Sequence, residues 1–412
     1  MSVAGRVQLY LAKAASMFLM PASRQTSVAS PGGRLLELDA LRGLMLVWIA
    51  LTHLPTNLSK YVNQPFGYVG ATEGFIFLSA LFTGFIYFRL SQREGVREMC
   101  RRLWMRAGRL YCYHLSLLLV AFVVGAPIAA RSYRPALHNL LDFYFVAGRY
   151  RAFVDAALLL YRPPLLDILP IYIIFLLATP IILIVAGRLG WRYALGGSFL
   201  LWLFAQFGFR TFVHELLTRD FGLHIPLNQM GAFDLWAWQF WWIVGLWFGV
   251  HWVKGDLALD RRAKQMAVPA AILAAFFLVL RYAEAAGLVE IRRFGVLVNK
   301  WDFGVGRIVD FAALATLAIR YRAMLSRLAI RPLVLLGQAS LEVFCVHLFC
   351  VFAALTALGG KPVLTGWQAL ASISISISAM FFTAVIIANR RATRGDRPKI
   401  PLVAPVPIRK AA

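Results

Sequence analysis

Runs of apolar residues long enough to cross a lipid bilayer recur along this chain, and short polar stretches separate them. A helix needs about 20 predominantly apolar residues to cross the hydrocarbon core, so each run of that length predicts a membrane-spanning helix. About ten are expected, at residues 40–58, 69–90, 103–125, 165–186, 191–207, 232–252, 266–285, 304–320, 333–357 and 366–389. The predicted fold class is therefore all-α: a polytopic integral membrane protein whose helices form one bundle.

This pattern divides the chain into three parts. Residues 1–33 combine a mildly amphipathic piece with a Ser/Pro/Gly linker, 34–389 form the membrane domain, and 390–412 form a basic tail. A signal peptide competes with an interfacial helix as the interpretation of the first part. Lys13 interrupts the apolar run and no clean cleavage site follows, which favours an interfacial segment in the cytoplasm.

Composition agrees with a membrane protein, because 60% of the residues are hydrophobic and only 15% are charged. The net charge of +24 could indicate nucleic-acid binding, but the basic residues are dispersed in short loops between the apolar runs. Of 43 Lys and Arg residues, 29 fall on one side of the alternating topology and 14 on the other. The positive-inside rule then predicts two cytoplasmic termini and excludes nucleic acid as the expected partner.

The four cysteines show no spacing typical of a metal site. Cys100, Cys112, Cys345 and Cys350 all fall in or beside apolar segments. We interpret them as small buried hydrophobic residues in a reduced state, and no metal is expected.

The first predicted span carries ionisable residues at one end and a histidine towards the other. Arg34, Glu37, Asp39 and Arg42 cluster near its start, and His53 follows Arg42 by eleven residues. On a helix this separation is about 16 Å along the axis, which is roughly half of a hydrocarbon core. Polar groups at such depth are costly, so a functional role is the first hypothesis. The alternative is that Arg42 anchors the helix and His53 lies at the opposite interface.

A carboxylate is expected close to the depth of His53. The second span starts on the outer side, so Glu73 in the segment Gly70–Ser79 comes to a similar level in the membrane. There it can orient the imidazole and raise its basicity, as a general base requires. The alternative is that Glu73 caps its own helix or pairs with an arginine.

Seven arginines follow the second span at intervals that place most of them on one helix face. They are Arg89, Arg93, Arg97, Arg101, Arg102, Arg106 and Arg109. One interpretation is a stripe that binds anionic lipid head groups. The other is a docking site for the phosphates of coenzyme A, which is available in the cytoplasm.

Polar and aromatic residues also gather at the predicted outer ends of three spans. They are Asp167 and Tyr172, Trp238 and Gln239, and Asn299, Lys300 and Arg307. Taken singly, each fits a helix cap or the aromatic belt at the interface. Taken together, they predict an outward-facing rim that binds a sugar.

The ninth span adds a second buried histidine, His347, in its outer half. Two roles remain open for it: a structural histidine with satisfied hydrogen bonds, or a second group of the active site. Ser340 lies seven residues earlier, about 10 Å along the helix, so a Ser–His nucleophile pair is not expected. Ser340 fits better as a polar contact between helices.

These segments resemble a known family. Arg42 and His53, with ten residues between them and preceded by Glu37 and Asp39, are similar to the first-helix motif of the acyltransferase-3 superfamily of membrane enzymes. Asp39-Ala-Leu-Arg-Gly-Leu-Met and Leu51-Thr-His-Leu-Pro resemble the OpgC family more closely, as do Gly70–Ser79, Asp167–Tyr172 and Gly337–His347. The chain departs from that pattern at Ala80, Asp234, Asp310 and Glu342.

The resemblance implies a multi-pass protein of the bacterial inner membrane that succinylates periplasmic glucans. It implies a donor, acyl-CoA and specifically succinyl-CoA, held at Arg34, Asp39 and Arg42 without a tightly bound cofactor. His53 would be the general base, with Glu73 and His347 as its partners, and an acyl-histidine intermediate is a variant. Arg307, Asn299 and His347 are equal candidates for stabilising the oxyanion.

Two other classes of function remain open from the residues alone. In a proton-coupled transporter of a small solute or glycan precursor, His53, Glu73 and His347 would form a proton relay. In a membrane scaffold for glycan synthesis, none of these residues would be catalytic. Coenzyme A binding would separate the enzyme from both.

Overall fold

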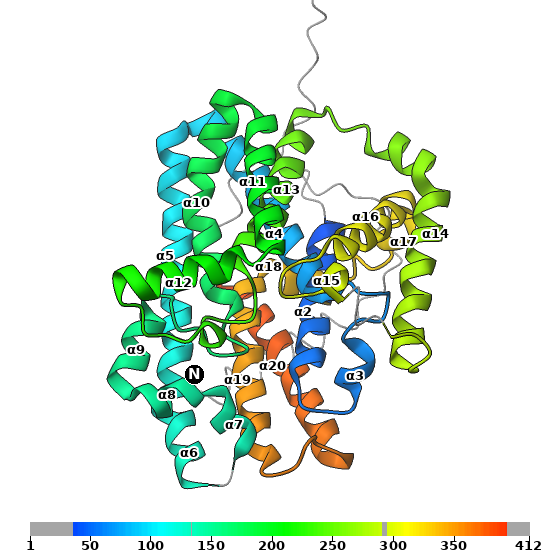
Figure 1. Ribbon diagram of the computed structural model, residues 1–412. Helices are drawn as coiled ribbons and strands as arrows, with labels where there is room; N and C mark the ends of the chain where they lie inside the picture. The colour runs from blue at the N-terminus through cyan, green and yellow to red at the C-terminus, as the bar shows by residue number, and fades with distance from the viewer. Residues whose placement is uncertain (1–35, 133, 291–294, 394–412) are drawn as a thin grey trace, which may run out of the picture.

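The computed structural model describes residues 36–132, 134–290 and 295–393, and nearly all of its regular structure is helical (Figure 1). Within these residues the one β-type pairing is an isolated bridge between Thr56 and Leu364. The predicted all-α fold class is confirmed for this part of the chain. Arg34, the N-terminal segment 1–33 and most of the basic tail lie outside the described residues.

Six helices in the described part are long and apolar enough to cross a membrane. They are α4 (Ala71–Glu94), the continuous helix Val96–Arg131, α10 (Ile168–Leu189), α14 (Leu259–Ala285), α19 (Ser340–Leu358) and α20 (Gly366–Thr393). Each coincides with a predicted span, but six is fewer than the ten that the apolar pattern predicted. The ninth span is also divided, because α18 (Arg331–Gln338) ends before α19 begins.

The other four predicted spans are helices that fail the same test of length and composition. They are α2 (Leu36–His53), α11 (Trp191–Gln206), α13 (Leu235–Lys254) and α16 (Val305–Arg320). With 16 residues each, α11 and α16 are about 24 Å long, shorter than a hydrocarbon core. Three charged residues lie in the first two turns of α2, and α13 is rich in tryptophan, whose indole N–H is polar.

Val96–Arg131 is made of three consecutive elements: α5 (Val96–Val120), the π-helical turn η2 (Ala121–Gly125) and α6 (Ala126–Arg131). Pro127 has no backbone N–H and cannot complete the regular hydrogen-bond ladder, which explains the irregular turn beside it. Shorter elements fill the connections. They are α3 (Leu58–Val62), α7 (Pro135–Leu140), α8 (Asp142–Ala147), α9 (Arg149–Ala157), α12 (Phe209–Phe221), η3 (Leu227–Gln229), α15 (Gly295–Val298) and α17 (Arg322–Ser326).

Glycines bring α2 and α18 into backbone contact. A Cβ atom added to Gly43 would lie 2.0 Å from the carbonyl oxygen of Leu333, and one added to Gly337 would lie 1.8 Å from that of Asp39. Small residues allow such close approach between membrane helices, where apolar burial alone gives little attraction. This contact fixes the rotation of α2 about its own axis and therefore the direction in which His53 points.

A second close contact joins α4 to α13. Gly245 and Gly249 on α13 form a Gly-x-x-x-Gly pair that faces Ala80 and the carbonyl of Leu81, and Gly84 on α4 faces the carbonyl of Leu246. The same small-residue packing applies. As a result α4, which carries Glu73, is held against α13.

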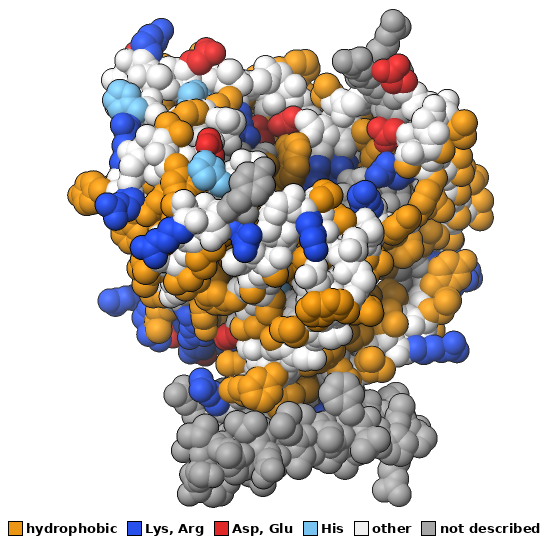
Figure 2. Space-filling view, turned by 90° about the horizontal axis from the view of Figure 1, so that it is seen from below, with side chains coloured by type: hydrophobic (Ala, Val, Ile, Leu, Met, Phe, Trp, Pro, Cys, Tyr) orange, Lys and Arg blue, Asp and Glu red, His pale blue; other side chains and the backbone are white. Residues whose placement is uncertain are grey.

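Apolar side chains also cover the outside of the molecule. In the end-on view of Figure 2, hydrophobic side chains line the right flank, where Figure 1 places α14, and charged side chains are scattered over the end face. The flank includes the exposed residues Val268, Ile272, Phe276 and Val279 of α14. Exposed apolar residues along a helix of membrane-spanning length are typical of a lipid-facing surface. All four cysteines are free. Cys345 is buried as predicted, but Cys100 and Cys350 are only half-buried and Cys112 is exposed.

Candidate functional site

The two histidines proposed for the site lie side by side. His53 is the last residue of α2 and His347 is fully buried in α19, 294 positions later in the chain. Nδ1 of His53 is 3.2 Å from Nε2 of His347, and the two ring centroids are 5.4 Å apart. This is hydrogen-bond distance, so one ring donates a proton and the other accepts it. The structure therefore brings together two of the three candidate catalytic residues.

Glu73, the third candidate, bonds elsewhere. Its Oε1 atom accepts a hydrogen bond from Arg307 at 2.7 Å, and its Oε2 atom accepts one from the backbone N–H of Gly70 at 3.0 Å. The described residues show no hydrogen bond between Glu73 and His53. The expected orientation of His53 by Glu73 is thus absent from this geometry, which matches the alternative of a helix cap paired with an arginine.

Arg307 forms that ion pair in a buried site. Its side chain is 4% exposed and that of Glu73 is 0% exposed. Besides Glu73, it donates hydrogen bonds to the backbone carbonyls of Val298 and Tyr68. A buried ion pair with additional hydrogen bonds fixes the elements that carry it, so here α16, α4 and the segment before α4 are tied together.

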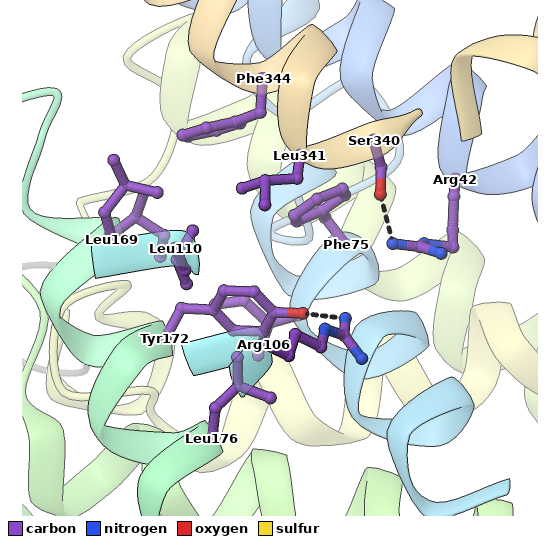
Figure 3. A pocket seen from close by; sticks show the side chains of 12 residues that line it. Arg42, Phe75, Arg106, Leu110, Leu169, Tyr172, Leu176, Ser340, Leu341 and Phe344 are labelled. Atoms are coloured by element: carbon purple, nitrogen blue, oxygen red, sulfur yellow. Dashed lines mark hydrogen bonds between the residues drawn. The ribbon is translucent and has the colours of Figure 1, made fainter. Parts of the chain in front are cut away.

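A pocket lies between α2, α4, α5, α10 and α19 (Figure 3). Its cavity volume is about 50 Å³, and its wall is mainly apolar. Two guanidinium groups, those of Arg42 and Arg106, enter it from different helices. Arg42 donates a hydrogen bond to Oγ of Ser340 at 2.5 Å, and Arg106 donates one to the hydroxyl of Tyr172 at 2.8 Å.

Two phenylalanines connect this pocket to the histidine pair. Phe75 and Phe344 line the pocket, with ring centroids 6.2 Å apart in a stacked arrangement. Phe344 also packs edge-on against His347, with 4.7 Å between the ring centroids. The pocket and the histidines are therefore separated by about one aromatic ring, and they can act on one extended substrate.

Among the predicted donor-binding residues, Arg42 faces the pocket and Asp39 does not line it. Asp39 is 1% exposed and packs against α18, where the side chain of Gln338 lies 3.4 Å from its Oδ2 atom. Arg34 lies outside the described residues. In the arginine stripe, Arg101 and Arg102 bond the carboxylate of Glu98, whereas Arg106 turns into the pocket.

The sequence pattern predicts Arg106 only as one member of that stripe. Its hydrogen bonds are to hydroxyl groups, those of Tyr172 and Thr83, and no carboxylate neutralises it within the described residues. A half-buried arginine without an acidic partner favours an anionic ligand. The sequence does not show that Arg106 and Tyr172 meet, because the two residues belong to different helices and lie 66 positions apart.

The predicted outer rim does not stay together in the structure, because Tyr172 lines the pocket and Arg307 pairs with Glu73. Lys300 is close enough to His53 and to Asp167 for an electrostatic interaction with each. Asp167 is 6% exposed, and its Oδ2 atom accepts a hydrogen bond from the backbone N–H of Ala232 at 3.1 Å.

Trp238, Gln239 and Asn299, which were also predicted for the rim, make structural contacts instead. Trp238 is 0% exposed, so its ring offers no face on which a sugar could stack. Gln239 bonds Ser198 on α11 through both ends of its amide. Asn299 bonds the Asp302 carboxylate and the backbone N–H of Trp301. The interpretation of these three as a sugar-binding rim does not match their positions.

Sequence reasoning also missed a pair of arginines beside Asp167. Arg162 is 8% exposed, and burial together with the charge of Arg210 lowers the pKa of its guanidinium to about 10. Arg210 donates hydrogen bonds to the carbonyls of Leu227, Gly231 and Ala232 and so holds that loop in place. The described residues contain no group of three or more His, Cys, Asp or Glu side chains arranged to hold a metal ion.

Comparison with known proteins identifies the family of the chain. No curated protein and no solved structure matches it. A family model described as OpgC protein matches residues 34–392, which include the histidine pair, the pocket and the Glu73–Arg307 ion pair. The chain therefore belongs to the OpgC family, and this membership implies a function in glucan modification.

Proposed function

We propose that this protein transfers an acyl group from cytoplasmic acyl-CoA to a hydroxyl group of a periplasmic glucan. Succinyl-CoA is the proposed donor, because succinylation of glucans is what the resemblance to the OpgC family implies. The observation that carries the proposal is the connection from two converging arginines, through Phe75 and Phe344, to a hydrogen-bonded histidine pair.

The donor enters the pocket and meets Arg42 and Arg106. Guanidinium groups bind phosphate oxygens through charge-assisted hydrogen bonds, and the apolar walls suit the aliphatic parts of the pantetheine arm. The phosphates of coenzyme A are separated from the thioester by the pantetheine arm. The arm spans the distance from the arginines past Phe344, so that the thioester reaches His53.

His53 acts as the general base through Nε2. Its Nδ1–H donates to Nε2 of His347, which leaves Nε2 of His53 unprotonated, and that atom makes no hydrogen bond within the described residues. This tautomer is the one required to take a proton from a sugar hydroxyl. His347 thus takes the orienting role that the sequence assigned to Glu73.

The transfer balances without another reactant. The sugar oxygen loses its proton to His53 and attacks the thioester carbonyl carbon, which forms a new C–O bond and a tetrahedral oxyanion. When the oxyanion collapses, the C–S bond breaks and the coenzyme A thiolate takes the proton from His53. The products are the glucan ester and free coenzyme A.

The proposal also includes the orientation of the protein in the membrane. We place both termini in the cytoplasm of a bacterial inner membrane, and we count α2, α11, α13 and α16 with the six longer helices as parts of the membrane bundle. This orientation puts the start of α2 on the donor side and His53 towards the acceptor side.

The direct test is acyl transfer by purified protein in nanodiscs. Radiolabelled succinyl-CoA and periplasmic glucan should give labelled glucan and an equal amount of free thiol. His53→Ala should abolish both products while keeping the elution profile of the wild-type protein. If the wild-type protein releases no thiol and labels no glucan but moves protons across a proteoliposome membrane, the transporter interpretation replaces this one.

A further inference from the structure

The connection between α9 and α10 contains two strained leucines. Leu159 and Leu165 have φ angles of 63° and 69°, in the left-handed region that residues with a side chain rarely adopt. Between them lie Pro163 and Pro164, whose rings restrict the backbone further. Strain of this kind persists only where the surroundings enforce it, and it concentrates at functional sites. The one charged residue between the two leucines is Arg162.

Arg162 is held in place along its backbone and its aliphatic stem. Its backbone N–H donates a hydrogen bond to the carbonyl of Gln229 at 3.0 Å, and its Nε–H donates one to the carbonyl of Leu159 at 2.9 Å. Gly231 packs against the stem, because a Cβ atom added to this glycine would lie 3.1 Å from Cβ and 3.2 Å from Cδ of Arg162. These contacts fix the direction of the guanidinium group.

The two Nη groups of Arg162 are left without a partner. The residue is 8% exposed, and within the described residues its Nη groups make no hydrogen bond or ion pair. Two carboxylates act on it electrostatically, those of Asp167 and Asp234, but both accept hydrogen bonds from backbone N–H groups instead. Burying N–H donors of a cation without a partner is costly, so this arrangement favours an anionic ligand that completes them.

Packing places this connection beside both parts of the proposed site. Leu165 packs against a buried cluster that includes Leu54 and Val351. Leu54 directly follows the first histidine of the pair, and Val351 lies one turn after the second. Leu169, in the first turn of α10, lines the pocket. The segment that carries Arg162 therefore borders the histidine pair on one side and the pocket on the other.

We propose that the Nη groups of Arg162 bind a carboxylate. This inference rests on the proposed function, because a succinyl group keeps one free carboxylate when it is attached either to coenzyme A or to the glucan. The ligand is thus the end of the donor's acyl group or a succinyl group already present on the acceptor. A guanidinium fork binds a carboxylate through two parallel charge-assisted hydrogen bonds. No bond is made or broken at Arg162, which is a substrate-binding residue.

Binding to the protein in nanodiscs tests this without any turnover. Calorimetry compares two pairs of ligands: succinyl-CoA with butyryl-CoA, which lacks the terminal carboxylate, and succinylated glucan with unmodified glucan. We expect the wild-type protein to bind the carboxylated member of one pair about 10- to 100-fold more tightly. Arg162→Met should lose this preference and keep its affinity for the other member, and Arg162→Lys, which keeps the charge without the fork, should retain part. The pair that responds identifies the source of the carboxylate.

Arg210→Met is a matched control for a purely structural loss. Arg210 donates its hydrogen bonds to the backbone carbonyls of Leu227, Gly231 and Ala232, so its removal loosens the loop that covers Arg162. We expect a lower melting temperature and weaker binding of both members of a pair to the same extent.

Three results would overturn the proposal. The first is equal affinity of the wild-type protein for both members of each pair, a result that needs no variant. The second is the full wild-type preference in Arg162→Met. The third is equal weakening of both members in Arg162→Met with a lower melting temperature, as in Arg210→Met, which would make Arg162 structural. Failure of the proposed function is a different result: the wild-type protein would bind with the expected preference but release no thiol when succinyl-CoA and glucan are both present.

Discussion

Nδ1 of His53 lies 3.2 Å from Nε2 of His347, across the contact between α2 and α19. A neutral imidazole is a weaker partner than a carboxylate, but it can still fix the tautomer of its neighbour and share the positive charge that develops. The proposed base, His53, is therefore supported by a second histidine.

We expect His347→Ala to lower kcat by about 100-fold or more, because His53 loses the acceptor that holds its Nδ1–H. His347→Gln should lose less, since the amide oxygen can stand near the position of Nε2. Steady-state kinetics of glucan acylation measures both. Equal activity in the wild-type protein and His347→Ala would leave His347 as a packing residue.

Arg106→Met should raise the KM for acyl-CoA and leave the KM for glucan nearly unchanged. A charge-assisted hydrogen bond from a partly desolvated group is worth about 1.5–3 kcal/mol, which is roughly one to two powers of ten in affinity. Arg192→Met is a matched control, because exposed Arg192 also bonds a tyrosine hydroxyl but lies outside the pocket. A change of both KM values to the same extent would argue against a donor site at Arg106.

Glu73→Gln should destabilise the protein more than it slows catalysis. Removing one charge of a buried pair leaves Arg307 without its hydrogen-bonded carboxylate, and breaking such a pair typically costs about 3–5 kcal/mol. Thermal unfolding in detergent should show this loss, and Glu73→Gln combined with Arg307→Gln should recover part of it. Glu94→Gln, which removes an exposed partner of Arg102, should leave the melting temperature unchanged. If the Glu73→Gln protein were stable but inactive, Glu73 would have a role in the reaction and not only in stability.

Gly337→Ala should separate α18 from α2 and destabilise the protein, because the new Cβ atom would lie 1.8 Å from the carbonyl oxygen of Asp39. The displaced α2 should also lose acyl transfer, since it carries His53. Gly108→Ala in α5 meets no atom within 4 Å and should be neutral or slightly stabilising. Comparing the melting temperatures and activities of the two variants checks the prediction. Similar values for both would show that the close contact is unimportant.

The orientation predicts which exposed positions react with a membrane-impermeant thiol reagent. In a cysteine-free background, Lys361→Cys should react in intact cells, and Glu37→Cys should react only after the inner membrane is permeabilised. Both positions are exposed in the structure. Labelling of Glu37→Cys from outside would place the donor pocket on the wrong side, and the proposed mechanism would fail.

Much of the site could be predicted from the sequence, but the sequence could not tell whether Glu73 or His347 contacts His53. The spacing of Arg42 and His53 predicted a cation and a base at two depths on one helix, and the structure places Arg42 in the pocket and His53 in the histidine pair. Glu73 and His347 were both predicted to lie close to the depth of His53 in the membrane. Sequence spacing gives the position of a residue along a helix, but it does not give the helix face that meets a particular neighbour.

The sequence by itself determined the all-α class, the positions of the helices and the family, because apolar periodicity and local motifs are properties of consecutive residues. Only the tertiary structure decided which side chains meet. Backbone contact at Gly43 and Gly337 sets the rotation of α2, and His53 points to His347 on α19. The glycine contacts between α4 and α13 leave Glu73 facing Arg307 instead. These partners lie more than 200 residues apart, and the packing of backbones that brings them together has no signature in either segment alone.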